Sequence, residues 1–232
     1  MKKISVIVPM YYEEKVVTEC YNRLTKCLKE IKNYNYEIII IDDGSKDKTL
    51  DIIEKIASQD KHIKIISFSR NFGHQAAVTA GLKHVTGDAI VIIDADLQDP
   101  PELIPQMIHL WEQGNEIIYA KRKKRNGESP FKLLSAKMFY QILNALSDTE
   151  IPKDTGDFRL VDRKVEDTIN EMPEHNKFLR GLFSWVGYKQ IPFEYEREER
   201  FAGKTKYPLR KMLKLAADGI FSFSTKPLKS SL

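Results

Sequence analysis

The sequence of 232 residues lacks long apolar runs and contains only two cysteines. None of its apolar stretches approaches the roughly 18 residues that suggest a membrane-spanning helix. The amino-terminal lysines and apolar residues resemble a secretion signal only as far as Pro9, and Glu13 and Glu14 then interrupt them, so we exclude a signal peptide. Cys20 and Cys27 are about 10 Å apart by helix rise, which is too far for a disulfide. We therefore expect reduced thiols in a cytoplasmic protein.

Several nucleotide and zinc motifs are also missing. No G-x-G-x-x-G follows the first apolar run, which argues against a dinucleotide cofactor. The letters GKT at 203–205 resemble the end of a P-loop, but Glu198 stands where the first glycine of that loop would be. The His and Cys residues form no zinc-ligand spacing. We expect His74, at a helix start, to be a polar packing residue and not a ligand.

The net charge of +4 is unevenly distributed. Residues 200–232 contain eight Lys or Arg and one acid, whereas residues 1–199 contain 29 basic and 32 acidic residues. A basic tail on a slightly acidic body predicts an anionic partner: a phosphate, a membrane surface or a nucleic acid. We disfavour nucleic acid, because neither an aromatic stacking set nor a nucleic-acid motif accompanies the charge.

Apolar strands alternate with amphipathic helices through the first half of the chain. The predicted strands are 3–11, 36–45, 63–69, 89–94 and 116–122, and the predicted helices are 14–31, 47–57, 73–85 and 101–113. Such strands predict an α/β fold with a mostly parallel sheet covered on both faces. The second half is less regular, with helices predicted at 131–146, 176–188 and 209–223 and extended segments at 155–163 and 189–196.

Acidic or polar residues follow three of the predicted strands, at 11–13, 42–45 and 94–96. Ligands of parallel sheets bind beyond these carboxyl ends. Asp94 and Asp96 are two residues apart, so in extended chain both side chains would point the same way. Mg²⁺ or Mn²⁺ takes oxygen ligands, and Mg²⁺ often combines carboxylates with substrate phosphates. The pair therefore predicts a metal-bridged nucleotide diphosphate; the alternative is a solvated acidic loop.

The turn after the second strand carries two separable predictions. Asp42 can accept a hydrogen bond from the N–H of a uracil or guanine. Ser45 and Asp47 are assigned instead to capping the following helix.

Six stretches together resemble one known family: VIVPMYYEE, IIIIDDGSKDKT, FSRNFGHQAAVTAGL, IDADLQDPPE, GDFRLVDR and RFAGKTKY. They resemble the family 2 inverting glycosyltransferases, in particular the polyprenyl-phosphate subgroup that is similar to dolichol-phosphate mannose synthase. The resemblance implies a glycosyltransferase A-type, Rossmann-like fold with a D-x-D metal site. It also implies transfer of a sugar from UDP or GDP to the phosphate of a lipid carrier. Chain polymerisation is disfavoured, because the sequence has no Arg–Trp pair of the kind found in processive synthases.

The resemblance assigns roles residue by residue. It implies four residues at the nucleoside, namely Pro9, Tyr11, Glu13 and Asp42. It implies a metal and diphosphate group of Asp94, Asp96 and Gln98, with Asp94 and Asp96 binding the metal. It implies Asp157 near the reacting centre, which makes Asp157 and Asp96 the catalytic candidates. It implies Arg200 and Lys206 near phosphate, with Thr205 in place of the usual serine.

Two of these assignments have alternatives. Asp157 is the candidate base, but a lipid phosphate with a second pKa of about 6 needs little deprotonation. Asp157 then orients or balances charge, or it caps a backbone turn. Arg122 and Arg125, in a basic run after the fifth strand, either grip donor or acceptor phosphate or belong to a solvated loop.

The whole chain is interpreted as a catalytic domain, 1–206, followed by an amphipathic tail, 207–232. Helix 209–223 has an apolar face and a basic face, which predicts a helix lying on an anionic membrane surface; the alternative is a helix packed on the domain. Relatives in the subgroup continue into membrane helices, so we expect these to be missing from this sequence or the protein only to touch the cytoplasmic face of the membrane.

Two other functions also fit parts of the sequence. One alternative is a non-catalytic module that binds sugar nucleotides or anionic lipids, and another is a family 2 transferase with a non-lipid acceptor. A sugar-1-phosphate nucleotidyltransferase is excluded, because "VPMYYEEKV" lacks its glycine-rich loop. The oligomeric state, including a homo-oligomer, is left open.

Overall fold

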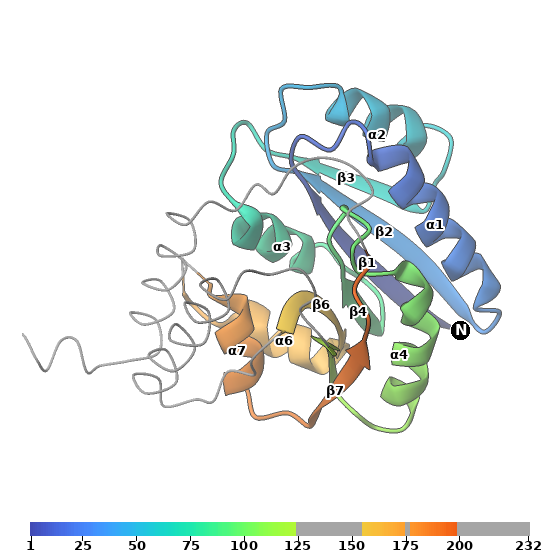
Figure 1. Ribbon diagram of the computed structural model, residues 1–232. Coiled ribbons are helices and arrows are strands. Elements are labelled where there is room, and N and C mark those ends of the chain that lie inside the picture. Colours follow the sequence, from blue (N-terminus) through green and yellow to red (C-terminus); the bar gives the residue numbers. More distant parts are fainter. Residues whose placement is uncertain (124–154, 175–176, 199–232) are drawn as a thin grey trace, which may run out of the picture.

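The computed structural model describes residues 1–123, 155–174 and 177–198 (Figure 1). The predicted helices 131–146 and 209–223 lie outside these residues, as do Arg125, Arg200 and Lys206. In the described part of the chain, no helix is long and apolar enough to cross a membrane.

The described residues form one seven-stranded sheet with helices packed against it (Figure 1). The strands are β1 (Lys2–Met10), β2 (Tyr34–Asp42), β3 (Ile63–Ser67), β4 (Ala89–Ile92), β5 (Ile117–Arg122), β6 (Thr155–Asp162) and β7 (Gln190–Tyr195). The helices are α1 (Val17–Glu30), α2 (Thr49–Ala57), α3 (His74–Leu82), the 3₁₀ turn η1 (Pro101–Leu103), α4 (Ile104–Glu112), α6 (Arg163–Glu171) and α7 (Leu179–Trp185).

The strand order β3-β2-β1-β4-β6-β5-β7 confirms the predicted mostly parallel sheet. The exception is β6, which pairs antiparallel with both β4 and β5. In the register of β4 and β6, Ile92 lies opposite Arg159. The start of β6 therefore lies at the same edge of the sheet as the carboxyl ends of β1, β2 and β4.

Each face of the sheet is covered by its own hydrophobic cluster. Alternating residues of β1 show the division, because Val6 and Val8 pack with α1 and α4 while Ile7 packs with α3 and α6. This alternation follows from the side-chain period of two along a strand. Cys20 and Cys27 are buried and unpaired, as expected for reduced thiols.

Helix α6 was not predicted from the sequence. Its first turn is capped by Asp162, whose side chain accepts a hydrogen bond from the amide of Lys164. Val165 and Ile169 are its buried apolar residues, and they lie four apart on one face. An aspartate before this spacing is a recognisable helix start, although only two apolar residues support it.

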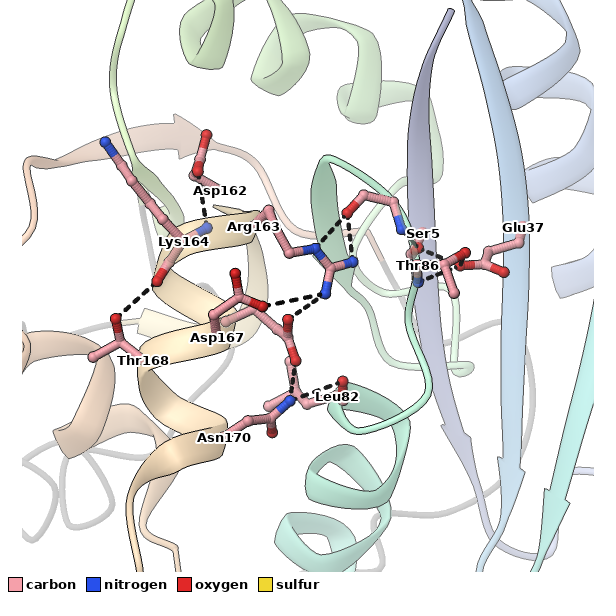
Figure 2. Close-up of polar contacts among 12 residues, drawn as sticks. Ser5, Glu37, Leu82, Thr86, Asp162, Arg163, Lys164, Asp167, Thr168 and Asn170 are labelled. Atoms are coloured by element: carbon pink, nitrogen blue, oxygen red, sulfur yellow. Dashed lines mark hydrogen bonds and ion pairs between the residues drawn. The ribbon is translucent and has the colours of Figure 1, made fainter.

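A polar network at the opposite edge of the sheet holds the turn between α3 and β4 (Figure 2). The buried carboxylate of Glu37 accepts hydrogen bonds from Ser5 Oγ at 2.6 Å and from the amide and hydroxyl of Thr86 at 2.7 and 2.8 Å. From the other side, Arg163 Nε donates to the carbonyl of Gly87 at 2.8 Å. The turn is thereby fixed both to the first two strands and to α6.

The same network reaches the last residue of α3. Asn170 Nδ2 donates to the carbonyl of Leu82 at 3.3 Å and also to Glu166, which pairs with Arg163 (Figure 2). Burial raises the pKa of Glu166 to about 7, although Arg163 opposes this shift.

Candidate active site

The acidic pair after β4 lies on a turn. The strand ends at Ile92, and Leu97 has a φ of 58°, a left-handed conformation that is unusual for a leucine. Asp94 and Asp96 therefore lie beyond the extended strand, so the sequence argument that extended chain directs both carboxylates the same way does not apply to them. Asp96 is buried, and its Oδ1 accepts a hydrogen bond from the amide of Gln98 at 3.1 Å. Asp94 is partly exposed.

The donor atoms of this turn fit a hard divalent cation only together with a ligand. Within the described residues, no three His, Cys, Asp or Glu side chains form a group that could hold a metal ion. Asp94 and Asp96 offer carboxylate oxygens, and Mg²⁺ characteristically combines one or two carboxylates with substrate phosphates and waters. The turn thus suits a cation that arrives with, or is completed by, a phosphate-bearing ligand.

His74 links Asp94 to Asp157. Its Nε2 hydrogen bonds with Asp94 Oδ1 at 2.8 Å, and its Nδ1 lies 3.7 Å from Asp157 Oδ2. Burial lowers the pKa of His74, but the two carboxylates outweigh that effect and raise it to about 9. His74 thus lies between two carboxylates of the site, and the expectation that it is a polar packing residue and not a ligand stays a prediction.

Asp157 is held by a bidentate ion pair. Arg180, from α7, donates through Nε to Oδ1 at 2.7 Å and through Nη2 to Oδ2 at 2.9 Å. Burial alone would raise the pKa of Asp157, but Arg180 and His74 hold it well below its ordinary range. A carboxylate with this low proton affinity is a weak base. The reversed direction of β6 is what brings Asp157 to the ligand edge beside Asp94.

In the turn after β2, Ser45 has a different partner from the one predicted. Asp42 Oδ2 accepts a hydrogen bond from the amide of Ser45 at 3.1 Å, while Oδ1 is buried without a hydrogen-bond partner among the described residues. Ser45 does not cap α2; its hydroxyl accepts from the amide of Tyr12 at 3.0 Å. Asp47 accepts from the amide of Thr49, the first residue of α2, as expected. Asp42 thus has one oxygen to offer to a ligand N–H.

The residues after β1 form the neighbouring wall. Pro9 is buried in β1, opposite Ile41 of β2. Tyr11 and Tyr12 have ring centroids 4.3 Å apart, and Tyr12 has a φ of 55°. The amide of Glu13 donates to Thr49 Oγ1 at 2.8 Å, which ties this loop to α2. A non-glycine residue at positive φ is a strained conformation of the kind found at ligand sites.

Asp43 was not singled out in the sequence, yet it fixes the loop before α3. Its buried carboxylate accepts hydrogen bonds from the amides of Phe72 and Gly73 at 2.7 and 2.9 Å, and from Asn71 Nδ2 at 2.7 Å. His74 follows directly, so Asp43 also determines where α3 begins.

A second buried acid, Asp99, lies beyond the D-x-D turn. Only 1% of it is exposed, and it hydrogen bonds with the hydroxyl of Tyr195 and pairs with Arg197 at 3.4 Å. Burial and the nearby Asp94 raise its pKa, against the effects of Tyr195, Arg197 and Arg122. Arg122, a predicted phosphate ligand, therefore lies in the neighbourhood of the D-x-D turn.

The structure thus gathers the predicted residues of the first four strands, together with Asp157 and Arg122, along one edge of the sheet. Sequence reasoning missed several residues of the site, Asp99 and Arg197 among them. Asp43 and His74 stand within the motifs that carry the family resemblance, so their proximity to the site could have been inferred. Arg180 and Tyr195 had no local signal, because each meets its partner across a long stretch of sequence.

Comparison with known proteins identifies the family. The family model described as "Glycosyl transferase family 2" matches residues 5–169. The chain is 56% identical over 225 residues to an uncharacterized glycosyltransferase, YkcC, of Bacillus subtilis, covering 97% of this chain and 69% of that protein. It is 45% identical over 227 residues to a prophage bactoprenol glucosyl transferase homolog of Escherichia coli, covering 98% and 74%.

Solved structures resemble the chain in fold. Glucosyl-3-phosphoglycerate synthase of Mycobacterium tuberculosis, in complex with Mn²⁺, UDP-glucose and phosphoglyceric acid, aligns with a TM-score of 0.57 at 19% identity, covering 93% of this chain and 76% of that chain. A Pyrobaculum calidifontis mannosyltransferase with GDP-Man and Mn²⁺ aligns with a TM-score of 0.58 at 16% identity, covering 95% and 69%. The chain belongs to glycosyltransferase family 2 and has the glycosyltransferase A-type fold that its sequence predicted.

Proposed function

We propose that this chain transfers a sugar, with inversion, from a UDP-linked donor to a polyprenyl phosphate at the cytoplasmic face of the membrane, with Mg²⁺ or Mn²⁺. The acceptor class is suggested by relatives named bactoprenol glucosyl transferase in Shigella phages SfX, SfV and SfII. These are 43% to 44% identical to the chain over 227 residues. A UDP-linked donor is in keeping with the A-type neighbour that binds UDP-glucose with Mn²⁺.

The observation that carries the proposal is the row Asp94–His74–Asp157–Arg180 at the ligand edge. It places a candidate metal ligand and a candidate acceptor-side carboxylate on either side of one histidine. A donor diphosphate at Asp94 and a reacting sugar near Asp157 would then lie next to each other, as a one-step transfer requires.

The donor side combines three contacts. Asp42 Oδ1, which is buried and has no hydrogen-bond partner among the described residues, accepts the N–H of the base. Asp94 and Asp96 would hold the divalent cation, whose chemistry is to neutralise the charge that develops on the leaving nucleotide diphosphate. His74 fixes one oxygen of Asp94 through a hydrogen bond at 2.8 Å.

On the acceptor side, the pairing with Arg180 favours a charge and orientation role for Asp157 over that of a general base. A lipid phosphate with a second pKa of about 6 is largely ionised near neutral pH and can attack without giving up a proton. Asp157 then keeps Arg180 and His74 in place around the reacting centre. Arg122, with Arg125, Arg200 and Lys206 outside the described residues, supplies positive charge for the acceptor phosphate.

The membrane part of the proposal rests on the basic tail. A polyprenyl phosphate keeps its chain in the bilayer, so the site must meet the phosphate at the surface. Each Lys or Arg near an anionic surface adds about 1 kcal/mol of attraction, screened by salt. The chain should therefore co-sediment with anionic liposomes at low salt and much less at high salt, and equal binding to neutral liposomes would contradict this part.

The test of the reaction uses UDP-glucose labelled in the sugar, Mn²⁺ and undecaprenyl phosphate in detergent. We expect label to enter the organic phase with wild-type protein and not with Asp96→Asn or in EDTA. GDP-mannose in place of UDP-glucose tests the choice of nucleotide. Label that enters only water-soluble products would favour a non-lipid acceptor, and donor binding without any turnover would favour a binding module; either result would overturn the proposal.

A further inference from the structure

The chain leaving β7 is fastened to the loop that carries the D-x-D turn. We call residues 195–198 the strap and residues 94–99 the metal loop. The amide of Glu198 donates to the carbonyl of Gln98 at 3.0 Å, and the hydroxyl of Tyr195 donates to Asp99. Arg197 Nε lies 3.4 Å from the same carboxylate. In Figure 1 the chain after β7 runs beside the loop that follows β4. Three consecutive contacts therefore join two segments about a hundred residues apart.

Asp99 also touches the starts and ends of the neighbouring strands. A Cβ added at Gly156 would lie 3.9 Å from Asp99 Oδ2 and 3.4 Å from Arg122 Nη2, so the backbone at Gly156 passes beside both side chains. The amide of Lys123 donates to the carbonyl of Tyr195 at 3.0 Å, which ties the end of β5 to the strap. The buried carboxylate is thus the common neighbour of the metal loop, the strap, Arg122 and the residue before Asp157.

We propose that Asp99 and Tyr195 are positioning residues that lock the strap to the metal loop and so couple occupancy of the donor site to the geometry of the acceptor side. Neither residue touches the reacting atoms. Asp99 acts through Arg122, whose guanidinium it neighbours, and Tyr195 acts through the strap.

The placement of the strap gives this lock its function. Lys123, which follows the predicted phosphate ligand Arg122, donates its amide to the carbonyl of Tyr195. The strap therefore holds the end of β5, which carries Arg122. A donor that orders the metal loop would order the strap through Gln98 and Asp99, and would thereby prepare the acceptor side. The identity of the acceptor in this inference rests on the proposed function, whereas the contacts that support the inference are independent of that function.

The first test is kinetic and uses Tyr195→Phe, which removes one hydroxyl and leaves the ring. We expect the KM for undecaprenyl phosphate to rise by roughly tenfold, the equivalent of one hydrogen bond, while the KM for UDP-glucose stays within about twofold. The matched control is Tyr34→Phe, because Tyr34 also donates its hydroxyl to a carboxylate, that of Glu112, at 2.6 Å and away from the site. Equal changes in both KM values, or the same change in the control, would overturn the proposal. Arg197→Gln, at a partly exposed side chain, should shift the acceptor KM in the same direction and serves if Tyr195→Phe does not fold.

The second test needs no acceptor. Hydrogen exchange is followed in peptides covering residues 120–123 and 195–198, with and without UDP and Mn²⁺. The amides of Glu198 and Lys123 should exchange faster in Tyr195→Phe than in wild type or Tyr34→Phe. UDP with Mn²⁺ should slow the strap in wild type and in the control but not in Tyr195→Phe. If the strap of the wild type does not respond while UDP binds, the coupling is refuted. If the strap responds but no glycolipid forms with any sugar nucleotide, the proposed function fails and the lock stands.

Discussion

Replacing Arg180 with glutamine should destabilise the protein through a single, well-defined loss. The substitution removes the two hydrogen bonds to Asp157 and the positive charge that accompanies them. The carboxylate stays behind, 14% exposed, with the half-buried His74 and Arg159 as its remaining cationic neighbours. The matched partner variant is Asp157→Asn, which keeps the shape of the side chain and leaves Arg180 without its counter-charge.

The expected magnitude follows from burial. Removing one partner of a buried ion pair costs about 3–5 kcal/mol, whereas hydrogen bonds to charged groups are worth about 1.5–3 kcal/mol. Because 24% of the Arg180 side chain is exposed and other cations remain near Asp157, we expect about 2–3 kcal/mol for Arg180→Gln. The double variant should be less destabilised than the sum of the two single variants by about 2 kcal/mol.

Urea denaturation of the wild type, both single variants and the double variant at pH 7 measures this coupling. The pH dependence gives a second check. The folded-state pKa of Asp157 lies below its unfolded value of about 3.9, so the charge of Asp157 contributes stability that is present above about pH 4 and lost as the pH falls through the folded pKa. The stability difference between wild type and Asp157→Asn should be constant from about pH 5 to 7 and narrow below about pH 4. Additive effects in the cycle, or a difference that grows on acidification, would refute the electrostatic pairing.

The remaining predictions concern single carboxyl groups. Asp96→Asn should abolish turnover and metal-dependent donor binding in a folded protein, because an amide is a weaker ligand; normal turnover by the variant, or wild-type activity in EDTA, would count against the assignment. Asp42→Ala should weaken UDP binding in calorimetry by about 1.5–3 kcal/mol, and unchanged affinity would place the base elsewhere. Asp157→Asn should lower the transfer rate by a factor of about 10², because Arg180 and His74 lose the carboxylate that positions them at the reacting centre, and a near-wild-type rate would exclude a catalytic role. Folding raises the pKa of Glu166 to about 7. The protonated side chain therefore stabilises the folded protein at a pH below the pKa of the unfolded state, and this stabilisation is lost as the pH rises through 7. Glu166→Gln should therefore lose less thermal stability than wild type between pH 5 and pH 8, and parallel melting curves would contradict the raised pKa.

Strands and strand ends were the most predictable parts of the molecule. The apolar run before Asp42 is long, and β2 ends at that residue. A carboxylate that follows such a run is recognisable without a structure, because it marks the carboxyl end of a parallel strand. The family motifs then supplied the roles. The boundary after β4 was less well predicted, since nothing in the letters around Leu97 signals a positive φ.

Contacts between distant residues could not be predicted from one sequence. Arg180 meets Asp157 across 23 residues, and Tyr195 meets Asp99 across 96. Neither pair belongs to a periodic pattern, and hydrophobic periodicity carries no information about which charges meet. The direction of β6 was equally hidden, because an apolar strand buried between two others reads the same in either orientation.

Helix α3 is pinned at both ends and pressed against the sheet along its length. His74, its first residue, hydrogen bonds with Asp94, while Asn170 holds the carbonyl of its last residue, Leu82. Between them, a Cβ added at Gly81 would lie 2.7 Å from the side chain of Ile7. Nine residues span about 13 Å, so the helix is a rigid element that connects the two edges of the sheet. A substitution at Asn170 would therefore shift helix α3 along its axis and displace the imidazole of His74 at its other end. Selection for altered activity should recover substitutions at such remote positions.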